Sequence, residues 1–149
     1  MVADDEILRL IPHRPPFLWV DSIVLFEDDV ITTEKLIPAD LDTFTGHYPG
    51  NPIMPGVLLC EIIFQSGALL MAKMNFGAKS EAHAVPVLTR IENAKFKRSV
   101  LPGDLVTVKV VVKEILSSVC FLKGTLKVKG KTAVQVVFAC TLVTSSESD

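Results

Sequence analysis

Hydrophobic residues in this chain form one long helical stretch and a series of shorter extended runs. Residues 55 to about 75 are apolar on nearly every side of a helix, and a segment rich in proline and glycine, 44–55, leads directly into them. Asn75-Phe76-Gly77 ends the helix, because glycine adopts the left-handed conformation that most residues resist. A helix without a polar face must be buried on nearly all sides, so we expect it at the centre of the core.

Extended segments make up most of the remaining chain, and turn residues separate them. Glu27-Asp28-Asp29 predicts the tip of a hairpin, Leu101-Pro102-Gly103-Asp104 predicts a turn, and Gly130 predicts the last turn. Near the N-terminus, acidic residues precede a short apolar run that Pro12 ends, which predicts one or two turns of helix. We expect about six strands, drawn from the segments 17–20, 23–26, 30–37, 85–100, 105–115, 119–129 and 132–143.

These elements predict an α+β fold of the hotdog type, in which a curved antiparallel sheet of about six strands wraps around one long central helix. The open edge of such a sheet often pairs with a second chain, so we expect a dimer. With 149 residues the chain is long enough for one core and too short for two comfortable domains. Residues 1–149 are therefore expected to form a single domain, with about 144–149 as a frayed tail.

Charge and composition exclude several classes of protein. The net charge of -2 and a pI near 5.9 give no general attraction to nucleic acid or to an anionic membrane. The longest apolar run is far shorter than the roughly 20 residues that span a bilayer, and the N-terminus lacks a signal-peptide pattern, so we expect a cytoplasmic protein with no membrane partner. Cys60, Cys120 and Cys140 occur singly in apolar surroundings, which favours buried free thiols over a metal site.

Two residues of the central stretch, His47 and Glu61, are the candidates for chemistry. His47 lies where proline and glycine stiffen the backbone, and an imidazole is suited to act as a base near neutral pH. Glu61 lies inside the apolar helix, where a carboxylate is costly to bury; taken alone, a buried salt bridge explains it equally well. His13 has no acid or nucleophile beside it in the sequence, so we assign it to a loop at the entry to the first strand, and we assign His83 to the surface.

Three segments of the sequence are similar to a known family. They are IPHRPPFLWVD near the start, GHYPGNPIMPGVLLCEIIFQ in the centre and FKRSVLPGDLV after the helix. In these segments, and across roughly residues 7–143, the chain resembles the β-hydroxyacyl-acyl-carrier-protein dehydratases of the FabZ type. The central motif is the most specific part of the resemblance, and one departure from it is Tyr48, where phenylalanine is usual.

The resemblance implies dehydration of a (3R)-hydroxyacyl-acyl-carrier-protein to the trans-2-enoyl product, in fatty-acid or related acyl synthesis. It implies no cofactor, because the substrate is carried on the phosphopantetheine of the acyl carrier protein. It also implies that His47 of one subunit faces Glu61 of another, so that a homodimer, alone or in a trimer of dimers, holds shared active sites. Glutamate rather than aspartate on the helix further implies that the double bond is not isomerised.

This reaction defines a role for each candidate residue. A base must remove the proton next to the thioester carbonyl, which suits His47, and an acid must protonate the departing hydroxide, which suits Glu61. The backbone N–H groups of Gly56 and Val57, where the helix begins, are positioned to stabilise the thioester oxygen. Gln65 lies one helical turn beyond Glu61, where it either orients the carboxyl group or is a core polar group bonded to backbone.

The sequence also suggests roles for a basic cluster and for the apolar side chains of the helix. The basic cluster either receives the acidic carrier protein and its phosphopantetheine or forms a solvated strand face; it consists of Arg90, Lys95, Lys97 and Arg98. The aromatic and aliphatic residues of the helix are assigned to the core, with Phe64 as the one candidate for contact with an acyl chain.

Two other functions compete with a dehydratase. A hotdog acyl thioesterase would use a carboxylate with water and would not need His47 in this motif. A non-catalytic acyl-binding or partner subunit would have no reason to bury an acid. The presence of both His47 and Glu61 therefore favours the dehydratase.

Overall fold

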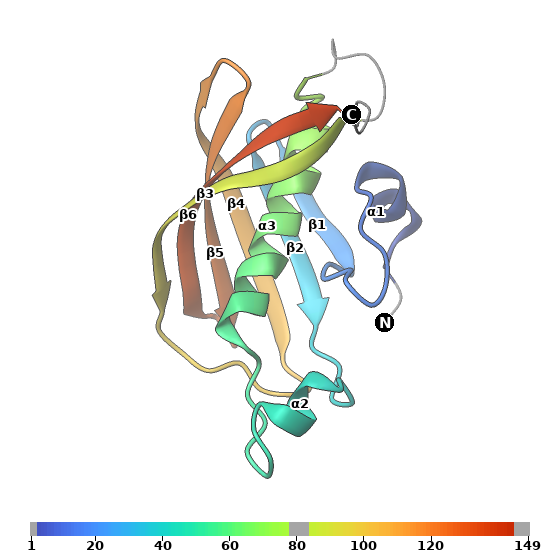
Figure 1. Ribbon diagram of the computed structural model, residues 1–149, viewed down its shortest axis with the longest axis vertical. Helices are drawn as coiled ribbons and strands as arrows, with labels where there is room; N and C mark the ends of the chain where they lie inside the picture. The colour runs from blue at the N-terminus through green and yellow to red at the C-terminus, as the bar shows by residue number, and fades with distance from the viewer. Residues whose placement is uncertain (1–2, 78–83, 145–149) are drawn as a thin grey trace, which may run out of the picture.

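The computed structural model describes residues 3–77 and 84–144. Six antiparallel strands form one sheet in the order β1-β2-β4-β5-β6-β3. In chain order the elements are α1 (Asp5–Leu10), β1 (Ser22–Glu27), β2 (Val30–Leu36), α2 (Thr43–Gly46), α3 (Gly56–Lys73), β3 (Ala84–Phe96), β4 (Leu105–Leu116), β5 (Val119–Val128) and β6 (Lys131–Thr144). The predicted α+β architecture is confirmed, because the sheet curves around the long helix α3 (Figure 1).

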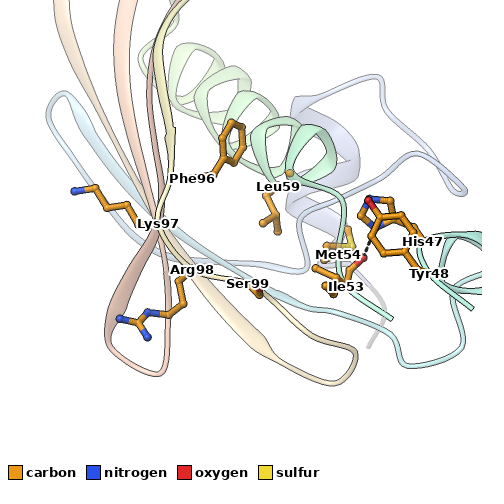
Figure 2. A pocket seen from close by; sticks show the side chains of 10 residues that line it. His47, Tyr48, Ile53, Met54, Leu59, Phe96, Lys97, Arg98 and Ser99 are labelled. Atoms are coloured by element: carbon orange, nitrogen blue, oxygen red, sulfur yellow. Dashed lines mark hydrogen bonds between the residues drawn. The ribbon is translucent and has the colours of Figure 1, made fainter. Parts of the chain in front are cut away.

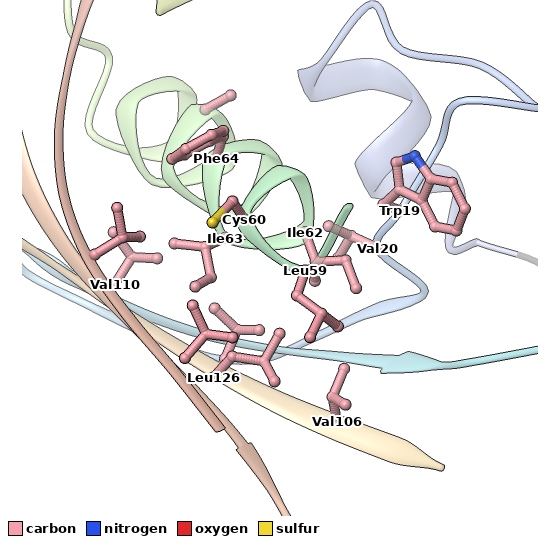
Figure 3. Packing of buried hydrophobic residues seen from close by; sticks show 14 of the residues in the cluster. Trp19, Val20, Leu59, Cys60, Ile62, Ile63, Phe64, Val106, Val110 and Leu126 are labelled. Carbon is pink, nitrogen blue, oxygen red and sulfur yellow. The ribbon is translucent and has the colours of Figure 1, made fainter. Parts of the chain in front are cut away.

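Helix α3 is the centre of the core, as its apolar sequence predicts. Every residue from Ile62 to Met71 is buried, including Gln65 and Ser66, so this part of the helix has no solvent-facing side. Ile63 points toward the sheet and packs near Val110 and Leu126 (Figure 3). By length and composition α3 would also be able to cross a membrane, but 61% of it is buried inside the protein, which is the behaviour of a core helix.

Helix and sheet approach most closely at two glycines. A Cβ atom added to Gly124 on β5 would overlap Cγ2 of Ile63, and one added to Gly67 on α3 would lie 2.7 Å from Cζ of Phe138. The absence of side chains at these positions lets β5 and β6 lie directly against α3. Interior packing at protein density leaves no room for an added methyl group there.

Substituting Gly124→Ala is expected to lower the free energy of unfolding by about 1–3 kcal/mol, because the new methyl group must displace Ile63. Urea unfolding followed by circular dichroism measures the change. The matched control is Gly46→Ala, where a Cβ would meet nothing within 4 Å; it should unfold within about 0.5 kcal/mol of the parent chain. Equal midpoints for the two variants would contradict the packing of Ile63 on β5.

The hairpin and turn predictions are confirmed. β1 and β2 pair antiparallel across Asp28 and Asp29, and the helix ends before Gly77, which has a φ of 75°. Gly103 and Gly130 also have positive φ values, at the two turns where glycine was expected. His83, which was assigned to the surface, and residues 145–149 of the predicted tail lie outside the described residues.

One local prediction was wrong, and one short element was missed. Residues 17–20 do not form a strand, because Pro15 and Pro16 begin a turn and the backbone N–H of Trp19 donates to the Gln65 side chain at 2.7 Å instead of to a neighbouring strand. The short helix α2 was not predicted. Its four residues are too few to produce a periodic hydrophobic pattern.

Candidate active site

His47 directly follows helix α2, and its ring is held in one orientation. Its Nδ1 lies 2.7 Å from the carbonyl oxygen of Ile53, as the dashed line in Figure 2 marks. Because a carbonyl can only accept, Nδ1 carries the proton and Nε2 of the neutral ring keeps its lone pair. The predicted base is therefore present in the tautomer that a base needs.

The proline and glycine turn after His47 supports this orientation. Tyr48 and Asn51 exchange backbone hydrogen bonds of 3.1 and 2.9 Å, and the Ile53 N–H donates to the His47 carbonyl at 3.0 Å. The Tyr48 ring also stacks on the His47 ring, with centroids 4.2 Å apart. The departure from the usual phenylalanine thus adds a hydroxyl to a ring that shields the imidazole.

His47 lines an open cavity of about 540 Å³ at the start of α3. The other lining residues include Met54, Gly56, Leu59, Phe96, Lys97 and Arg98 (Figure 2). Leu58 and Leu59 donate their N–H groups to the Pro55 carbonyl. The N–H groups of Gly56 and Val57 precede these bonds in the first turn, where a helix offers its own backbone no acceptor.

Gly56 is required by a close approach within this chain. A Cβ atom at this position would lie 2.9 Å from Cε1 of Phe96. From the sequence Gly56 was expected to offer its backbone N–H, and the contact with Phe96 was not foreseen, because the ring comes from β3, a strand distant in sequence.

Glu61 lies in the second turn of α3 and is held by Gln65. The Gln65 Nε2 donates to Glu61 Oε1 at 3.0 Å and to the Phe17 carbonyl at 3.0 Å, while its Oε1 accepts from the Trp19 N–H at 2.7 Å. Gln65 therefore makes both of the contacts that were considered for it, to the carboxyl group and to backbone. The Glu61 side chain remains 22% exposed, so it is less buried than its apolar neighbours in the sequence suggest.

His13 is the residue that sequence reasoning missed. Its Nε2 lies 3.9 Å from Glu61 Oε1, so the acid that is absent beside it in the sequence comes from α3. Burial lowers the pKa of His13 below the usual 6.5, the Glu61 carboxylate opposes that change, and Arg14 adds to it. His13 is part of the segment IPHRPPFLWVD that carries the family resemblance, which was a reason to consider it. Nothing in that segment indicates contact with the helix.

Glu61 and His13 line a second cavity of about 150 Å³, with Phe64, Gln65, Ala68, Pro86, Leu88 and Cys140. His47 does not line it, so one chain places the predicted base and acid in different cavities. Phe64, the one helix residue considered for contact with an acyl chain, lines the same cavity as Glu61. Among the residues that the structure describes, no group of three His, Cys, Asp or Glu side chains is placed to hold a metal ion.

The three cysteines are buried free thiols, as predicted. Burial raises the pKa of Cys120 to about 11 and that of Cys140 to about 12, where Cys120 and Glu61 add smaller contributions. The pKa of Cys60 is also raised, mainly by burial and further by Glu61.

The predicted basic cluster is divided in the structure. Lys97 and Arg98 line the His47 cavity, with Lys97 and Phe96 on opposite sides of the backbone (Figure 2). Arg90 instead donates to Glu92 at 3.2 Å, and neither Arg90 nor Lys95 lines the cavity. Only half of the cluster is therefore next to a candidate catalytic group.

Two solved structures share this fold. The dehydratase heterocomplex ApeI:P from Xenorhabdus doucetiae contains a chain that matches with a TM-score of 0.78, covering 93% of this chain and 91% of its own, at 13% identity. A hypothetical thioesterase from Streptococcus pneumoniae, solved with coenzyme A, matches with a TM-score of 0.65 at 10% identity and covers 95% and 94% of the two chains. At such low identities these likenesses confirm the fold alone.

Sequence relatives are more specific. The chain matches the FabA-like domain family over residues 11–137. It is 37% identical to the 3-hydroxyacyl-acyl-carrier-protein dehydratase FabZ of Aromatoleum aromaticum, with 95% of this chain and 98% of the relative covered. It is 39% identical to the FabZ of Caulobacter sp., with 93% and 84% covered. The chain therefore belongs to the FabA-like family and, within it, to the FabZ-type dehydratases.

Proposed function

We propose that this protein dehydrates (3R)-hydroxyacyl-acyl-carrier-proteins to the trans-2-enoyl products, in fatty-acid or related acyl synthesis. The observation that carries the proposal is the way in which hydrogen bonds orient the two candidate groups. His47 has its Nδ1 bonded to Ile53, which leaves Nε2 as the base, and Glu61 is held by Gln65 beside a small cavity. The remote likeness to a thioesterase concerns the fold, so it does not favour that alternative.

In the proposed reaction, Nε2 of His47 takes the proton from the carbon next to the thioester carbonyl. The electron pair of that C–H bond forms the new double bond as the bond to the hydroxyl group breaks. Glu61 gives its proton to the departing hydroxyl group, which leaves as water. The N–H groups of Gly56 and Val57 stabilise the negative charge that develops on the thioester oxygen.

The complete site is proposed to form between two chains. His47 and Glu61 line different cavities of one chain, so neither cavity alone supplies both proton transfers. In the described part of the sheet β3 is an edge strand, and it exposes the apolar side chains of Val87, Leu88, Ile91 and Phe96. Pairing two such edges in a homodimer would cover these side chains and bring the cavities of the two chains together. The same contact could recur in a trimer of dimers.

The acyl carrier protein is proposed to bind over the His47 cavity, because the positively charged Lys97 and Arg98 are among its lining residues. Its phosphopantetheine would deliver the thioester. The reaction transfers only protons and releases water, so we propose that it needs no resident cofactor. A cytoplasmic location is part of the same proposal.

The direct test is to incubate the purified protein with 3-hydroxyacyl-acyl-carrier-proteins of graded chain length and to follow the acyl group by mass spectrometry. The expected result is loss of one water from the acyl group while the thioester stays intact. Release of free acid would instead identify a thioesterase, and no change at any length would identify a binding subunit.

A further inference from the structure

Two side-chain nitrogen atoms lie near the same oxygen of the Glu61 carboxyl group. Gln65 Nε2 donates to Oε1 at 3.0 Å, and Nε2 of His13 lies 3.9 Å from that same Oε1. The other oxygen, Oε2, has no hydrogen bond to the described residues and is left for the substrate. His13 was assigned only a structural role from the sequence, and the mechanism above does not use it.

The proton of the neutral His13 ring is assigned to Nε2. Its Nδ1 is buried and has no hydrogen-bond partner in the described parts of the chain. A proton on Nδ1 would therefore be a buried donor without an acceptor, which is costly, whereas a proton on Nε2 is directed at the side where Glu61 lies. Burial lowers the pKa of His13, so the neutral form is the one present near neutral pH.

We propose that His13 is a positioning residue for the acid, donating from Nε2 to Oε1 of Glu61 as the proton leaves from Oε2. This inference rests on the proposed role of Glu61 as the general acid. The distance of 3.9 Å is longer than a direct hydrogen bond, and such contacts often tighten only when substrate is bound.

The proposed contact would act on the transition state more than on the ground state. In its proposed role as the acid, the carboxyl group becomes negatively charged as it gives its proton to the departing hydroxyl group. Hydrogen bonds to a charged acceptor are stronger than those to a neutral one, so the donors on Oε1 gain strength during this step. Gln65 and His13 would share this role.

The test compares His13→Phe, His13→Gln and His13→Asn in the full-length protein. Each is assayed with the 3-hydroxyacyl-acyl-carrier-protein chain length that the parent protein turns over fastest. His13→Phe keeps a ring but removes the donor, so kcat should fall roughly 10- to 100-fold while KM changes little. A glutamine amide reaches the position of Nε2 and should restore most of the loss. An asparagine amide reaches only the position of Nδ1 and should not.

The pH profile separates positioning from a structural role. Without the His13 donor the carboxyl group holds its proton more tightly, so the profile of kcat for His13→Phe should move to higher pH. Cys60 and Cys140 are the other titratable groups that interact with Glu61, Arg14 interacts with His13, and the proposed dimer adds His47 of the second chain; all are unchanged in these variants. Equal kcat losses in the Phe and Gln variants, with an unshifted profile, would overturn the inference.

A measurement on the resting protein covers the case in which His13→Phe does not fold. The ¹⁵N chemical shifts of the His13 ring in the parent protein should show a protonated Nε2, and Glu61→Gln should shift the Nε2 signal. A ring protonated on Nδ1 would overturn the inference and leave the proposed function intact. Full dehydratase activity in Glu61→Gln would overturn both.

Discussion

Glu61→Gln is expected to lower kcat for dehydration by about 10²–10⁴-fold, which is the usual contribution of a general acid or base. The amide keeps the shape of the side chain and can still contact Gln65, but it has no acidic proton to give to the departing hydroxyl group. His47→Ala should cause a loss in the same range, because it removes the base. Both rates are measured by mass spectrometry of the acyl-carrier-protein product.

Two controls make this result specific. Glu114→Gln makes the same chemical change at an exposed position of β4 and should keep the activity of the parent protein. Size-exclusion chromatography and thermal unfolding of Glu61→Gln should match the parent protein, since a buried or half-buried amide can replace a carboxyl group of the same shape. If Glu61→Gln turned over substrate at the parent rate, Glu61 would not be the acid.

Mixing the two inactive variants is expected to restore about a quarter of the parent activity if each site takes His47 from one chain and Glu61 from another. After full exchange in an equal mixture, about half of the dimers contain one chain of each kind. Each mixed dimer has one site with both substitutions and one site with neither. The variants are mixed, incubated until exchange is complete, and assayed for the enoyl product.

Exchange must be measured independently of activity. Chains labelled with different fluorophores report it through energy transfer between the two labels. The companion mixture combines the parent protein with the double variant His47→Ala plus Glu61→Gln. Shared sites predict about a quarter of the parent activity there, and sites within one chain predict about half. Complete exchange without recovery in the first mixture would contradict a shared site.

The sequence was sufficient for the features that depend on local pattern. An apolar helix without a polar face can only be a core helix, and α3 begins and ends within two residues of the predicted bounds. The turn glycines and most of the strands follow from the same kind of pattern. The quoted motifs were also specific enough to predict the family, which the sequence relatives confirm.

The sequence was not sufficient for contacts between distant segments. Gln65 accepts from the N–H of Trp19, 46 positions away, where a strand was predicted, and donates to Glu61 through the other end of its amide. His13 reaches Glu61 through the same arrangement, and Phe96 reaches Gly56 from β3. No periodicity encodes such pairs, because they depend on how the folded elements meet.

The thiol of Cys140 has a consequence for the chemistry beside it. An α,β-unsaturated thioester, the proposed product, is a Michael acceptor to which a thiolate can add, and Cys140 lines the cavity that holds Glu61. Burial raises the pKa of Cys140 to about 12, so this thiol stays protonated near neutral pH. Burial therefore keeps Cys140 in its less nucleophilic thiol form beside the proposed product.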